Sequence, residues 1–295
     1  MVPWRFSKPK GIGFGISKGF YLSVLSSASV LETLRDLVEP KGALGAIEGF
    51  IVPLAGDASK EALGQPLRRG AYGLSTRDRK TVLRMLVMSC DEAGYNPETF
   101  ARSSLAATAH PDLLARMRGA WTMSQFTFES HDPEVYPAID FLLHVAARHA
   151  AQSQGVVADP ISRRYLLPQE VLRAPRLDPK VDARELVSVQ LRVLPSGIHA
   201  YTLGMQKFGL PELELLNLLD GDAPMATRFL MTVCQTALAG DLVVSGDKFG
   251  HPSCPLEARD GGFDRGLWEG IAVFELLPPT AATPSEALAA WGSGL

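Results

Sequence analysis

The first pattern with possible chemistry lies at residues 15–19, which match the G-x-S-x-G motif around Ser17. In enzymes with this motif, the serine stands on a sharp turn between a strand and a helix, and acid and histidine partners follow along the chain. No helix-start signal follows Ser17 directly, and short glycine-rich segments match the motif by chance. The pattern alone does not predict a catalytic serine.

The glycines at positions 11, 13 and 15 invite comparison with phosphate-binding loops. A dinucleotide-binding fingerprint places its third glycine three positions after the second, where this chain has Ile16. A Walker loop requires serine or threonine after its lysine, whereas Lys18 is followed by Gly19. Neither motif is complete, and we expect no cofactor.

Histidine and cysteine spacing favours no metal site. His144 and His149 are five residues apart, which separates them by about 140° around a helix. Asp140 and His144 would share a helix face, but two ligands make an incomplete site. His251 and Cys254 have a plausible ligand spacing without a second pair. We therefore expect no bound metal.

Paired carboxylates are the remaining signature of an enzyme. Glu212 and Glu214 would share one face of a strand, because strand side chains alternate, but the sequence places no base or nucleophile beside them. A hydrolase would need residues that only the fold brings together, with a serine or an acid within hydrogen-bond reach of a histidine in a pocket. The candidates are Ser17, Glu212, Asp247, His199 and His251. The catalytic residues of such an enzyme stay unassigned.

Charge balance disfavours nucleic acid as the main partner. The 295 residues include 29 Lys and Arg against 32 Asp and Glu, a formal net charge of −3, whereas duplex-binding proteins carry a basic excess. The densest basic cluster predicts a solvated helix start with a flanking loop, and it leaves a nucleic-acid accessory protein as an alternative. It consists of Arg68, Arg69, Arg77, Arg79, Lys80 and Arg84.

Cysteine usage and hydropathy indicate a cytoplasmic protein. The three cysteines, Cys90, Cys234 and Cys254, are far apart and form no C-x-x-C pair, a usage typical of a reducing compartment. No stretch approaches the roughly 18 uninterrupted apolar residues of a membrane-spanning helix. We expect no membrane span.

Periodicity predicts a helix-rich N-terminal part over residues 1–119. Thr76 would cap a helix reaching about Ala93, because Val82, Leu83, Leu86 and Val87 follow a helical period. Further helices are predicted over 30–38, 97–107 and from 111 onward, with Ser29 to Glu32 as a capping box for the first. Strands are predicted over 11–25 and 47–54.

Residues 120–277 have the pattern of a mixed sheet with helices, and 278–295 that of a tail. A strand over 121–129, a helix over 133–154 and a strand over 156–158 form the clearest unit. A Pro- and Arg-rich connector over 160–182 precedes a hairpin whose strands, 186–194 and 198–203, are joined by a tight turn. Further predicted elements are a strand at 212–216, a helix at 224–239, a strand at 242–245 and a closing segment at 267–277.

These elements predict an α+β fold: a helical N-terminal part followed by a mixed or antiparallel sheet with helices packed on one face. The order strand, acidic loop, proline-started helix, glycine and extended segment occurs around 121–159 and again around 212–245. A pseudo-repeat is therefore possible, but shared architecture without common origin is an adequate explanation of the pattern.

The segment from Gly204 to Leu213 contains the run G-x-x-x-F-G-x-P-E-L. With the helix that ends at Gly240 and with the later Asp247, this C-terminal part resembles a bacterial family of uncharacterised proteins, domain of unknown function 4261. The resemblance implies a bacterial α+β domain and carries no established catalytic residues. Glycines at 204 and 209 suit tight turns between short strands.

Because no catalytic, cofactor or metal set is complete, the sequence favours a non-enzymatic cytoplasmic module that binds or regulates another protein. A homodimer is possible. An exposed sheet edge or an apolar surface patch would support this hypothesis. The alternatives are a hydrolase whose site is assembled by the fold and a nucleic-acid accessory protein.

Overall fold

The computed structural model divides the chain into two compact units, each with its own sheet and core. Unit 1 comprises Met1–Ser17 and Lys180–Leu295, and unit 2 comprises Lys18–Pro179. The structure describes residues 15–39, 49–53, 62–103, 106, 109–131, 133–171, 181–262, 265–279 and 281–294.

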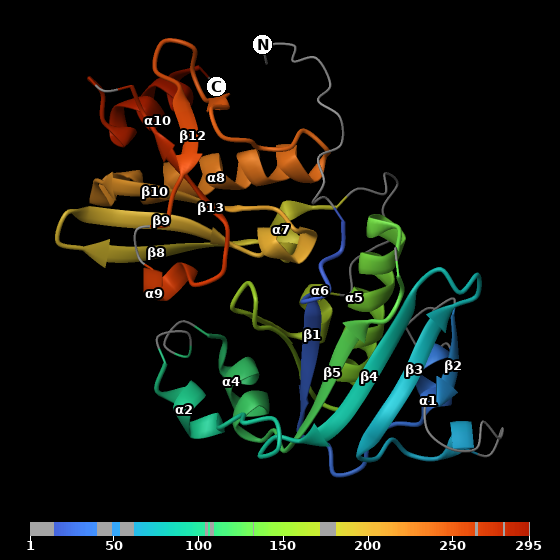
Figure 1. Ribbon diagram of the computed structural model, residues 1–295. Helices are drawn as coiled ribbons and strands as arrows, with labels where there is room; N and C mark the ends of the chain where they lie inside the picture. Colours follow the sequence, from blue (N-terminus) through green and yellow to red (C-terminus); the bar gives the residue numbers. More distant parts are fainter. Residues whose placement is uncertain are drawn as a thin grey trace. The chain divides into compact units, whose positions relative to one another are not determined.

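Unit 2 contains a seven-stranded sheet in the order β2-β3-β4-β5-β1-β6-β7, in which every neighbouring pair is antiparallel (Figure 1). The strands are β1 (Tyr21–Ser26), β2 (Gly49–Pro53), β3 (Gly70–Thr76), β4 (Val82–Ser89), β5 (Thr122–Phe128), β6 (Val156–Asp159) and β7 (Arg164–Leu166). The first strand of the described chain, β1, is an interior strand of this sheet and lies between β5 and β6.

The helices of unit 2 cover both faces of this sheet. They are α1 (Leu34–Val38), α2 (Pro97–Ala101), α4 (Pro111–Arg118), α5 (Val135–Gln152), α6 (Pro168–Val171) and the 3₁₀ turn η1 (Ala62–Gly64). Helix α5 packs on β1 and β6 with fully buried Leu142, Val145 and Ala146. Since strand side chains alternate, Leu25 of β1 faces the other side, where α2 and α4 lie.

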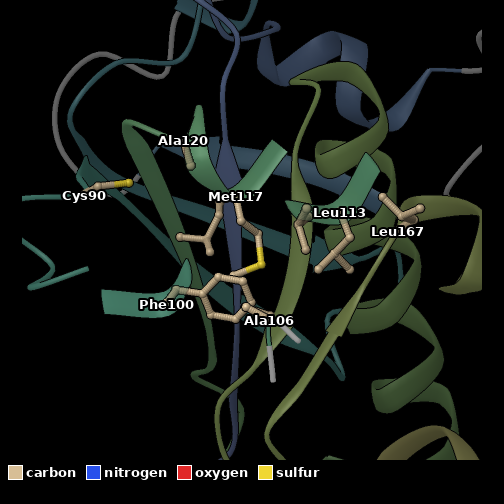
Figure 2. Packing of buried hydrophobic residues seen from close by; sticks show 10 residues of the cluster. Cys90, Phe100, Ala106, Leu113, Met117, Ala120 and Leu167 are labelled. Atoms are coloured by element: carbon tan, nitrogen blue, oxygen red, sulfur yellow. The ribbon is translucent and has the colours of Figure 1, made fainter. Parts of the chain in front are cut away.

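Helices α2 and α4 close that second side through one apolar cluster. Figure 2 shows Phe100 and Met117 side by side at its centre, with Leu113 and Leu167 next to them. Asn96 starts α2 by accepting hydrogen bonds from the N–H groups of Glu98 and Thr99, as expected for an N-cap residue.

Unit 1 contains a six-stranded sheet in the order β11-β12-β13-β10-β9-β8. The strands are β8 (Ser188–Leu194), β9 (Gly197–Leu203), β10 (Glu212–Leu218), β11 (Lys248–Phe249), β12 (Leu256–Asp260) and β13 (Val273–Leu277). Strands β10 and β13 are parallel and the other neighbours are antiparallel, so this sheet is mixed.

The helices of unit 1 lie on both sides of its sheet. Figure 1 shows α8 and α10 on one side and α9 on the other. Helix α8 buries Phe229, Leu230 and Val233, whereas Trp268 of α9 covers a cluster around Tyr201. The helices are α7 (Ala183–Leu186), α8 (Ala223–Leu238), α9 (Arg265–Trp268), α10 (Pro284–Ser293) and the 3₁₀ turns η2 (Met205–Phe208) and η3 (Asp220–Asp222).

The fold is α+β overall, but the prediction of a helical N-terminal part over residues 1–119 is wrong. The predicted helix over 76–93 instead comprises the last residue of β3, the turn that follows, β4 and the residues after it. Leu83, Met85 and Val87 are buried and the intervening Arg84 is exposed, which is the period of two of a half-buried strand. Apolar residues at 82, 83, 86 and 87 also fit a helix, so this segment satisfied both periods.

The first helix begins later than predicted. Thr33 and Asp36 form the capping box of α1, in place of Ser29 and Glu32. The predicted strand over 242–245 is wrong, since these residues are not in a strand. Part of the strand predicted over 11–25 lies outside the described residues, and β1 begins at Tyr21.

Several predicted elements are confirmed. Strand β5, helix α5 and strand β6 correspond to the strand–helix–strand unit predicted over 121–158. The hairpin predicted over 186–203 is β8–β9.

The predicted division of the chain between residues 119 and 120 lies inside unit 2. The boundary between the two units, at Pro179 and Lys180, lies within the connector predicted over 160–182. The tail predicted from 278 contains α10, whose Ala287 and Leu288 are buried.

The two units share one arrangement of strands and a helix. In unit 2 the antiparallel β3, β4 and β5 precede α5, and in unit 1 the antiparallel β8, β9 and β10 precede α8. The next strand in the sheet differs, because β1 is antiparallel to β5 whereas β13 is parallel to β10. A duplication stays a prediction. Within the described ranges, no helix is long and apolar enough to cross a membrane.

Candidate functional site

A buried carboxylate network lies between the sheet of unit 1 and α9. Glu214 of β10 is paired in register with Tyr201 of β9, and its Oε2 accepts hydrogen bonds from His199 Nε2 and Trp268 Nε1, both at 2.9 Å. Its Oε1 accepts a bond from the Gly262 N–H at 2.6 Å. Three donors therefore surround a carboxylate that is almost fully buried.

Two neighbouring carboxyl groups in this network have opposite pKa shifts. Burial alone would raise the pKa of Glu214, but the donors from His199, Gly262 and Trp268 outweigh it and lower the pKa. Glu275, its register partner on β13, has a raised pKa because of burial and the charge of Glu214. Opposite shifts of this kind are typical of acid–base pairs in enzymes.

The space around this pair argues for a structural role. A Cβ atom on Gly261 would lie 2.7 Å from Glu214 Oε1 and 2.6 Å from the Glu275 backbone nitrogen. The backbone thus already occupies the position that a substrate would need. Glu214 instead holds Gly262 and Trp268 of α9 against the sheet.

Glu212 binds residues in the connection between β9 and β10 through its carboxylate. Its carboxylate accepts hydrogen bonds from Thr202 Oγ1 at 2.7 Å and from the N–H groups of Gly204 at 2.7 Å and Gln206 at 3.2 Å. Burial raises its pKa although these donors act in the opposite direction. Gly204 has a φ of +128°, and a Cβ atom there would meet the Leu186 carbonyl oxygen. The glycine and glutamate of the family-like run therefore have a structural explanation.

The other candidates for a hydrolase make separate contacts. The Ser17 N–H donates to the Lys207 carbonyl at 2.7 Å, and Asp247 accepts a bond from the Val244 N–H at 2.9 Å. His251 Nδ1 lies 2.7 Å from Ser253 Oγ. Of the two histidines considered for a hydrolase, His199 and His251, only His199 forms a hydrogen bond with an acid in the part of the chain that the structure describes, and that acid is Glu214.

Sequence inspection missed a second network, in unit 2. His149 of α5 contacts Glu32 through Nδ1 and Ser124 of β5 through Nε2, the latter at 2.8 Å. An acid at one ring nitrogen and a serine at the other is the order of a catalytic triad. The only available signal was that His149 lies on the apolar side of a predicted helix.

This second network is enclosed. Ser124 and His149 are fully buried, and Ser124 is flanked in register by Val24 and Val87. A surface cleft of about 510 Å³ is lined by Leu31, Val87 and Thr122 among others, but not by Ser124. In this arrangement the serine hydroxyl meets no solvent, and the network links α5 to the sheet.

The basic cluster lies before β3, in the turn between β3 and β4, and at Arg84 of β4, where a helix start was predicted. Three of its members face carboxylates: Arg69 lies 2.5 Å from Glu92, Lys80 3.3 Å from Glu134 and Arg84 3.8 Å from Glu129. These exposed pairs contribute little to stability, but they lower the positive charge available to phosphate groups.

Strand β8 forms one edge of the sheet in unit 1. Its seven residues pair with β9 on one side, and among the described residues no strand pairs with its other side. Leu191 and Val193 are 49% and 81% exposed. At the opposite edge, β11 has two residues, one of them Lys248. Proteins usually protect edges by such short or charged strands. Strand β8 is longer than β11, and its one charged residue is Arg192.

The register shows which backbone groups of β8 are outward. Leu194 and Gly197 flank a two-residue turn and pair with each other, so they exchange both hydrogen bonds. Because hydrogen-bonded and non-hydrogen-bonded pairs alternate, the even-numbered residues of β8 bond to β9. The odd-numbered residues from Val189 to Val193 direct their N–H and C=O groups away from the sheet. All three of these residues have apolar side chains.

Comparisons of the chain with protein-family models, with curated proteins and with solved structures gave no match. The resemblance of the C-terminal part to the uncharacterised bacterial family therefore stays a prediction.

Proposed function

We propose that this protein is a non-enzymatic module that binds another polypeptide by adding it as a strand to β8. One observation carries the proposal. Outward backbone groups and exposed apolar side chains coincide on Leu191 and Val193, and the third outward residue, Val189, has an apolar side chain of intermediate burial. In strand addition, backbone hydrogen bonds supply affinity and alternate side chains supply specificity.

Selection of displayed peptides on the immobilised full-length protein tests the proposal. We expect the selected peptides to alternate apolar and polar residues, because a strand beside β8 presents alternate side chains to Leu191 and Val193. Leu191→Pro removes one outward N–H without touching the bonds to β9, and proline is tolerated at such edge positions. Binding of the selected peptides should therefore be lost.

The matched control is Val244→Lys, which changes another exposed valine of unit 1 and should leave peptide binding unchanged. Equal binding to wild type and Leu191→Pro would contradict the proposal, as would equal loss in both variants. Circular dichroism of each variant establishes that the fold is retained.

A serine hydrolase is the second candidate, favoured by the order Glu32, His149, Ser124. A fluorophosphonate probe, which labels activated serines, decides between the two. If the protein is the proposed binding module, we expect no labelling at Ser124, since this side chain is buried away from solvent. Labelling that disappears in both Ser124→Ala and His149→Ala would establish the hydrolase instead.

A further inference from the structure

We infer that the occupant of the β8 edge is a second copy of this chain, paired antiparallel about a two-fold axis at Leu191. This inference rests on the proposed function and names its partner. A two-fold dimer requires a surface that is complementary to itself. Strand β8 fulfils this requirement in one register.

Backbone geometry selects that register. The axis places Leu191 opposite Leu191 of the second copy. Val189 of each copy then lies opposite Val193 of the other copy. All three are outward residues, so each pair exchanges both hydrogen bonds, about six in total. A two-fold axis at Arg192 would use only two such pairs, about four hydrogen bonds. The register centred on Leu191 therefore uses every outward group of the strand.

The side chains are complementary in the same register. Leu191 and the two valines of each copy share one face, because strand side chains alternate, and they would form a continuous apolar row. On the other face, Arg192 stands opposite Gln190, so no two arginines oppose each other. Like charges directly opposite each other destabilise a strand pair, and an axis at Arg192 would create that arrangement.

Cysteine cross-linking tests the register. Across the axis, the two Cα atoms of residue 191 would lie about 5.5 Å apart, within the range of a disulfide. Residue 193 would lie opposite residue 189 of the other copy. The two copies of residue 193 would therefore be offset by four residues along the strand, about 14 Å apart. We expect Leu191→Cys to form a disulfide-linked dimer under mild oxidation and Val193→Cys to stay uncrosslinked. Both variants are made with Cys254→Ser, because Cys254 is the native thiol that is not buried.

This control is stringent because Val193 is the more exposed of the two residues. Random collisions would cross-link Val193→Cys more readily than Leu191→Cys. That order, or equal cross-linking of both, would overturn the inference, as would cross-linking of neither.

Sedimentation over a wide concentration range gives an independent readout. We expect a reversible dimer for the wild type. Gln190→Lys would oppose Arg192 of the other copy twice and weaken the dimer about tenfold, whereas Gln190→Glu would strengthen it. A monomer at every concentration refutes the second copy as occupant. If that monomer still binds the selected peptides through β8, the proposed function stands while this inference fails.

Discussion

His149 Nε2 lies 2.8 Å from Ser124 Oγ, which joins α5 to the central part of the sheet in unit 2. The other ring nitrogen contacts Glu32, just before α1. One imidazole thus connects three segments that are far apart in sequence. Since these side chains are buried, each polar group depends on its partner, and an unpaired one costs about 1–3 kcal/mol.

Ser124→Ala should therefore destabilise the protein by about 1–3 kcal/mol, because His149 Nε2 loses its partner in the core. Unfolding by urea, followed by circular dichroism, measures the change. His144→Gln is the control: this histidine is on the same helix but half exposed, and its replacement should change the free energy of unfolding by less than about 0.5 kcal/mol. Wild-type stability in Ser124→Ala would show that the bond contributes nothing.

Glu214→Gln should destabilise the protein at pH 7, and the difference from wild type should shrink at acid pH. The folded state lowers the pKa of Glu214 below its ordinary value of 4.5. The stability that the ionised group contributes is thus present above pH 4.5 and is lost as the pH falls through the lowered pKa. Urea unfolding at a series of pH values measures this dependence.

Glu275→Gln should have the opposite effect at pH 7. Burial and the charge of Glu214 raise its pKa in the folded state. Its ionisation therefore costs stability as the pH rises from 4.5 through the raised pKa, and the neutral amide avoids this cost. We expect a more stable protein at pH 7 and no difference at pH 4 or below. The same sign for the Glu214 and Glu275 variants at pH 7 would contradict the assigned pKa shifts.

Local signals predicted several elements of this fold. Asn96 and Pro97 mark the start of α2, and the turn at Pro195 and Ser196 predicts the β8–β9 hairpin. Each signal depends on neighbours within a few residues, so its structural effect does not require the rest of the chain.

Strand β4 was mispredicted because its local pattern is ambiguous. Leu83 and Val87 fit both a helical and a strand period, and only pairing with β3 and β5 decides between them. Pairing joins distant segments, which a local pattern does not report. The same reason explains why Glu32, His149 and Ser124 were not recognised as one network.

The sequence does not identify β8 as an edge strand. Its hairpin partner was predictable, but the edge position depends on strand order. Strand β13 comes from the C-terminal part of unit 1 and pairs with β10. Strands β10 and β9 therefore lie between β13 and β8 in the sheet. Had it paired with β8, Leu191 and Val193 would have been covered. Strand order is a property of tertiary packing, so the exposed face of β8 could not follow from its own residues.

Glu212→Gln and Glu212→Ala should separate charge from hydrogen bonding in the β9–β10 connection. Because burial raises the pKa of Glu212, the neutral glutamine, which keeps an acceptor for Gly204 and Gln206, should be at least as stable as wild type at pH 8. Alanine leaves the N–H groups of both residues without their acceptor, which costs about 1–3 kcal/mol for each buried group. Thermal unfolding of the three proteins at pH 8 gives the order. Glutamine and alanine variants of equal stability would refute the role of these hydrogen bonds.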